Sequence, residues 1–128
     1  MCYLQQMQRF GQARCPVLLL ALALAALASA GGCASLEAAR HAERGSQAID
    51  AGDPLRAIAE LEKAVALEPR AAALHNNLGI AYLAAGRVAD ARRSFERAVA
   101  LDCGHEPAQR NLRALREGRL APQGSREP

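Results

Sequence analysis

The chain is poor in aromatic residues, with no tryptophan, two tyrosines and two phenylalanines in 128 residues. Alanine supplies most of its apolar content, so any helices can approach closely while burying little area per residue. There is also no marked excess of one charge: the formal net charge is +3. It falls to about +1 if Arg9 and Arg14 are removed, a balance that argues against nucleic acid as a partner.

No catalytic constellation is visible either. The sequence contains no nucleophile paired with a base, no glycine-rich phosphate loop and no pair of carboxylates in a predicted pocket. We therefore expect a binding protein and not an enzyme, without a cofactor and without a metal ion.

The longest apolar run is too short to span a membrane. Residues 17–28 carry no charge, and the only charges before them are Arg9 and Arg14. About 14 apolar residues fall short of the ~20 that a spanning helix needs. A basic segment followed by a short apolar run is typical of a secretory signal peptide, and we assign residues 1–32 to one.

The segment Ala30-Gly31-Gly32-Cys33 resembles the lipobox of bacterial lipoproteins, with Ala30 in the place of the usual leucine. The resemblance implies cleavage before Cys33, which then carries palmitate-type acyl chains as a membrane anchor. In lipoproteins of this kind an aspartate directly after the lipidated cysteine retains the protein in the inner membrane, and this chain has Ala34 there. The resemblance therefore implies anchoring in the outer membrane of the cell envelope, facing the periplasm. Two alternatives remain: cleavage that releases a soluble periplasmic or secreted protein beginning at Gly31, or an uncut anchor.

The rest of the chain repeats itself with a fixed period. The peptides 64–68 and 98–102 are nearly the same, and Gly45 and Gly52 recur as Gly79 and Gly86. A constant spacing of about 34 residues is typical of a stacked helix-pair solenoid. Such a solenoid usually presents a binding surface.

Within each unit the pattern predicts a helix, a tight turn and a second helix. Apolar residues recur at helical spacing over residues 73–85, and Gly86 stands where a left-handed residue must reverse the chain. In the first unit Gly52 has that place. Asp53 then serves as N-cap and Pro54 as the first residue of the next helix.

These small residues at fixed places resemble the tetratricopeptide repeat (TPR). The resemblance implies an all-α fold, a short helix-pair solenoid with repeats at 38–71 and 72–105 and a C-terminal capping helix at 106–118. A lipidated N-terminus with a short spacer (33–37) precedes it, and a disordered tail (119–128) follows. The residues expected to pack the repeats are Gly45, Ala57, Ala64, Leu78, Gly79, Tyr82, Ala91, Phe95 and Ala98.

The same resemblance implies a partner-binding groove along the first helix of each unit. Its expected lining is small, apolar and nearly uncharged: Ala42, Ser46, Ile49, Asn76, Ile80, Leu83 and Ala84. Exposed Ile80 and Leu83 would favour an apolar helix or strand of a partner. The alternative is that these residues pack against the capping helix or against a second copy of the chain.

One cysteine remains in the mature chain if Cys33 is lipidated. Asp102, Cys103 and His105 offer three ligand types to a metal ion, but no second Cys/His pair accompanies them. A small apolar residue filling a turn is the alternative for Cys103.

The function that we expect is a non-catalytic envelope lipoprotein, whose repeats act as an adaptor or scaffold in protein–protein interaction. Pilus, secretion or cell-envelope assembly would be its setting, with envelope proteins as partners. The alternatives are a structural subunit that forms homo-oligomers and a soluble secreted thiol- or metal-binding protein that uses Cys103 and His105.

Overall fold

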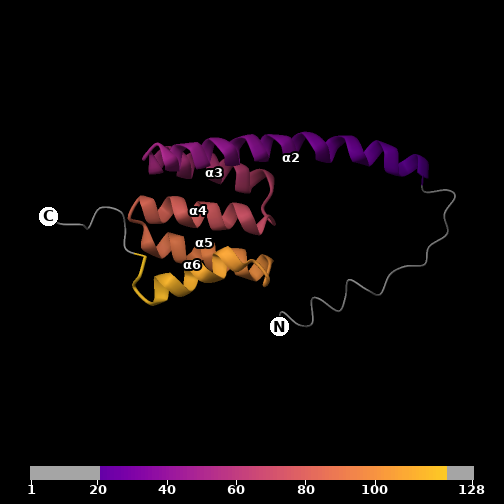
Figure 1. Ribbon diagram of the computed structural model, residues 1–128. Coiled ribbons are helices and arrows are strands. Elements are labelled where there is room, and N and C mark those ends of the chain that lie inside the picture. Colours follow the sequence, from indigo (N-terminus) through magenta and orange to yellow (C-terminus); the bar gives the residue numbers. More distant parts are fainter. Residues whose placement is uncertain (1–20, 121–128) are drawn as a thin grey trace. The chain divides into compact units, whose positions relative to one another are not determined.

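The computed structural model describes residues 21–120, with side chains from Ala34 onward (Figure 1). The chain divides into two compact units, Met1–Cys33 and Ala34–Pro128, and the second holds the repeats. Within residues 21–120, no helix combines the length and hydropathy that a membrane crossing requires. The helices are α2 (Ala21–Asp50), α3 (Pro54–Leu67), α4 (Ala72–Ala84), α5 (Val88–Leu101) and α6 (Glu106–Arg116).

The described residues are helical or in turns, as the period predicts, and the reversals fall at the expected glycines. Gly52 and Gly86 have φ angles of 71° and 75°, in the left-handed region that glycine enters without steric cost. After the first reversal, Asp53 Oδ1 accepts a hydrogen bond from the backbone N–H of Arg56 at 3.1 Å. Pro54 then begins α3. The all-α helix-pair fold is thereby confirmed.

The helices of the second unit pack in chain order, so that α3 contacts α4, α4 contacts α5, and α5 contacts α6 (Figure 1). Two groups of buried residues hold them together. The first joins α2, α3 and α4 and consists of Ala48, Ala57, Ile58, Leu61, Leu78 and Ala81. The second joins α4, α5 and α6 and consists of Leu83, Ala91, Phe95 and Leu112.

Close approach of paired helices depends on two glycines at equivalent positions of the two repeats. A Cβ atom on Gly45 would lie 2.6 Å from Cγ of Leu61, and one on Gly79 would lie 2.5 Å from Cε1 of Phe95. Leu61 and Phe95 are both fully buried. Of the nine residues expected to pack the repeats, eight are buried and Tyr82 is half-buried.

The structure changes two expected boundaries at the ends of the repeat unit. Residues 33–37, expected as a spacer, belong to helix α2. Leu120, expected in a disordered tail, packs half-buried against the second buried group. Most of the expected signal peptide and residues 121–128 lie outside the described residues.

Candidate partner-binding surface

The predicted groove residues come from α2 and α4, and the structure exposes them unevenly. Asn76 and Leu83 are buried, at 6% and 9% relative exposure. The other five are half-buried: Ala42, Ser46, Ile49, Ile80 and Ala84. The groove therefore offers less apolar surface than the sequence suggested.

Leu83 is the residue for which the expected exposure is wrong. It belongs to the second buried group, together with Phe95 of α5 and Leu112 of α6. Ile80 packs half-buried against the same group. The capping helix therefore covers the C-terminal end of the predicted groove, which was the alternative considered for these side chains.

Asn76 is buried by a polar contact with the same helix. Asn111 Nδ2 of α6 donates a hydrogen bond to Asn76 Oδ1 at 3.0 Å. Asn76 Nδ2 in turn donates weakly to Asn77 Oδ1 at 3.5 Å. Because a buried amide without a partner is costly, this pair fixes α6 against α4 as well as satisfying Asn76.

What remains accessible is a strip of small side chains on α2 and α4. Ala42, Ser46 and Ala84 are half-buried, and Ala73 is exposed at the start of α4. None of these residues is charged, so binding of a partner there carries no cost for the desolvation of a charged side chain. The strip can accept backbone or small apolar groups that approach closely.

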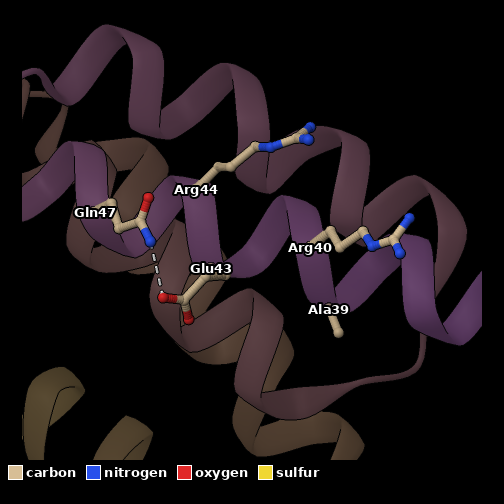
Figure 2. A pocket seen from close by; sticks show the side chains of 5 residues that line it. All are labelled: Ala39, Arg40, Glu43, Arg44 and Gln47. Carbon is tan, nitrogen blue, oxygen red and sulfur yellow. Dashed lines mark hydrogen bonds between the residues drawn. The ribbon is translucent and has the colours of Figure 1, made fainter.

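A different, polar surface lies on the outer side of α2. Ala39, Arg40, Glu43, Arg44 and Gln47 line an open hollow of about 510 Å³ there, and all five come from this one helix (Figure 2). Gln47 Nε2 donates to Glu43 Oε1 at 2.9 Å. A mixed-charge face of this kind is a solvated end of the stack and a poor site for an apolar partner.

The two histidines at equivalent repeat positions make different polar contacts. His41 Nδ1 lies 2.7 Å from Glu60 Oε2 of α3 in the same repeat, and Lys63 Nζ lies 2.8 Å from Glu60 Oε1. The hydrogen bonds from Lys63 and, next, from His41 lower the pKa of Glu60 to about 2. His75 Nε2 lies 3.0 Å from the carbonyl oxygen of Pro69. These contacts join α2 to α3 and fix the turn between repeats.

Tyr82 links the two repeats on a partly exposed edge. Its hydroxyl donates to Glu62 Oε1 of α3 at 2.8 Å, and Arg87 Cζ lies 4.6 Å from the centre of its ring. Burial, and next the hydrogen bond to Glu62, raise the pKa of Tyr82 to about 12. The position of this tyrosine was expected from the repeat, whereas its carboxylate partner was not.

The turn that holds Cys103 bears on the alternative of a thiol- or metal-binding protein. Cys103 is half-buried and disulfide-bonded. His105 Nδ1 accepts a hydrogen bond from the N–H of Ala108 at 3.2 Å, as the N-cap of α6. Over the part of the chain that the structure describes, no three His, Cys, Asp or Glu residues gather as a metal site. Geometry gives no support to a thiol or metal function at this turn.

Comparison with known proteins supports the repeat assignment. A search of the curated proteins finds no match to the chain. The family model of the tetratricopeptide repeat matches residues 42–105, half of the chain. The match covers the end of α2 and all of α3, α4 and α5, which are the four helices that carry the repeat period. The chain therefore belongs to the tetratricopeptide repeat family.

Proposed function

We propose that this protein is a non-catalytic envelope lipoprotein that holds a partner protein on its repeats, as an adaptor or scaffold. The tetratricopeptide fold supports the protein-binding part, since solenoids of this kind use their side-chain surfaces for recognition. The observation that carries the anchored part is the apolar run 17–28, followed by the lipobox-like segment that ends at Cys33.

The partner is an envelope protein in pilus, secretion or cell-envelope assembly, and it binds the uncharged strip on α2 and α4. Ala42, Ser46 and Ala84 tolerate larger side chains better than Leu83 does, because they are not part of the buried groups. Substitutions at these three positions therefore test binding without emptying the core.

The test is capture of partners from the native envelope with the full chain and with Ala42→Arg and Ala84→Arg. Ala59→Arg and Ala89→Arg are matched controls, because these alanines are exposed on α3 and α5. We expect the α2 and α4 variants to lose a protein that both controls retain. Equal capture by all four variants overturns the assignment of the strip as the binding surface.

The lipid anchor is tested separately by the mass of the purified chain and by its extraction into detergent. Cleavage before Cys33 with acyl chains attached supports the proposal. A protein that begins at Gly31 and is soluble without detergent overturns the anchor and favours the soluble alternative.

A further inference from the structure

We propose that one edge of the repeat unit, formed by the start of the folded part of α2 and the end of α3, rests on the phospholipid bilayer that holds the anchor. This inference rests on the proposed lipidation of Cys33. The residues that define this membrane edge are Leu36, Leu67, Pro69 and Arg70.

The first step is the absence of a flexible spacer. Helix α2 is already formed at Ala34 and continues to Asp50, so Ala34 joins a lipidated Cys33 directly to a packed helix. At about 1.5 Å of rise per residue, Leu36 lies only ~4.5 Å along the helix axis from Cys33. A repeat unit attached in this way cannot move far from the lipid surface.

The second step is a contact that brings the end of α3 to the same place. Ser35 Oγ donates a hydrogen bond to a carboxylate oxygen of Glu68. Leu36 follows the first of these residues and Leu67 precedes the second. The membrane edge is therefore built from two segments that are distant in sequence and are both close to the anchor.

The third step is the exposure of apolar side chains at this edge. Leu36 is 55% exposed and Leu67 is 36% exposed, and they are two of the four large apolar residues, with Leu55 and Val88, that are exposed in the part of the chain that the structure describes. Pro69 is also exposed. Transfer of such side chains from water to acyl chains is favourable, and the anchor already holds them at the interface.

The charged residues of the membrane edge do not supply its attraction to the bilayer. Glu37 and Arg70 at this edge are exposed and have opposite signs, and Glu68 accepts the hydrogen bond of Ser35. An edge with this balance gains little from anionic lipid. The contact should therefore form on zwitterionic vesicles and persist at high salt, since salt screens only charge–charge attraction.

The absence of tryptophan from the chain gives a direct test. The full lipidated chain is made with one tryptophan at a time, as Leu67→Trp, Leu36→Trp or Leu55→Trp, and is bound to phosphatidylcholine vesicles that contain brominated lipid. Leu55 is the matched control, since it is 71% exposed at the other end of α3. It lies about 18 Å along that helix from Leu67.

We expect the brominated lipid to quench the emission of Leu36→Trp and Leu67→Trp, with a shift to shorter wavelength, and to leave Leu55→Trp unchanged. Quenching should survive high salt.

Equal emission of all three variants on brominated and ordinary lipid overturns the inference, and quenching of all three does so too, because the whole of α3 would then face the lipid. If the chain carries acyl groups and binds vesicles but gives either of these two emission patterns, only the membrane-edge inference is overturned and the lipoprotein proposal stands. If the chain carries no acyl groups and stays in solution, the membrane-edge inference and the lipoprotein proposal are both overturned.

Discussion

Phe95 packs against Gly79 so closely that a Cβ atom on the glycine would lie 2.5 Å from ring carbon Cε1. The ring is fully buried and belongs to the group that joins α4, α5 and α6. It therefore has no free space into which it can turn. The distance between α4 and α5 is set at this contact.

We expect Gly79→Ala to lower the free energy of unfolding by about 1–2 kcal/mol. Alanine favours an isolated helix by ~1 kcal/mol over glycine, but overpacking of a filled core costs about 1–3 kcal/mol, and a Cβ atom 2.5 Å from a fully buried ring belongs in the upper part of that range, about 2–3 kcal/mol. Thermal and urea unfolding measure the difference. Gly104→Ala is the control, because its Cβ would meet only Asp102 Oδ1 at 3.4 Å. Unchanged or increased stability of Gly79→Ala contradicts the tight contact.

The amide pair between α4 and α6 gives a second prediction. Asn111→Ala removes the donor to Asn76 Oδ1 and leaves a buried amide oxygen without that bond. The loss should be about 1–3 kcal/mol. Arg113→Ala is the control on the same helix, since this side chain is exposed.

A double-mutant cycle with Asn76→Ala separates the pair from the effects of each residue alone. If the two substitutions prove additive in urea unfolding, the bond contributes nothing to the docking of α6.

Glu60 makes the free energy of unfolding vary with pH in the acid range. Its pKa falls from an ordinary 4.5 to about 2 in the folded protein, so its contribution is complete above pH 4.5. The contribution is lost as the pH falls from 4.5 towards 2, because the unfolded chain then binds the proton first. Glu60→Gln should cost on the order of 1 kcal/mol at pH 7, since Lys63, which makes the larger contribution to the shift, is exposed to solvent.

The measurement is urea unfolding of both proteins at several pH values, and the two curves should converge near pH 2. Glu96→Gln, an exposed residue on α5, is the control for the change of net charge. A cost of Glu60→Gln that stays constant from pH 7 to pH 2 would show that the pKa of Glu60 is not lowered by folding.

Tyr82 gives the opposite dependence at alkaline pH. Folding raises its pKa from 10.0 to about 12. The contribution of Tyr82 to the free energy of unfolding is therefore complete below pH 10 and is lost between pH 10 and 12. A mature chain that begins at Cys33 lacks Tyr3, which leaves Tyr82 as its one tyrosine. Phenolate absorbance then reports this group alone. Glu62→Gln should move the midpoint part of the way towards 10, and a wild-type midpoint already at 10 contradicts both the burial of Tyr82 and its hydrogen bond to Glu62.

The sequence predicted the helices, their reversals and their close contacts because local chemistry determines them. A positive φ at Gly52, a side-chain cap at Asp53 and room for Phe95 beside Gly79 each require a particular kind of residue at one position. The repeat period then places the same requirements in the chain a second time. Nothing distant in the chain is needed to interpret them.

The groove was predicted less well because its exposure depends on a helix outside the repeat. Leu83 occupies a position that the repeat leaves open, but Leu112 of α6 covers it. Asn76 is satisfied by Asn111 of α6, and neither amide predicts the other in the sequence. The partner of Glu60 was hidden for the same reason, since His41 lies on a separate helix.

The exposed side of α6, which carries Arg113, has a consequence for how such a protein could be lengthened. Arg113 stands one repeat period after Gly79, at the place where a further helix would have to approach as closely as Phe95 does. A large, exposed, charged side chain there blocks that approach. Exchange of this arginine for a glycine would therefore be one requirement for grafting an extra helix pair onto α6.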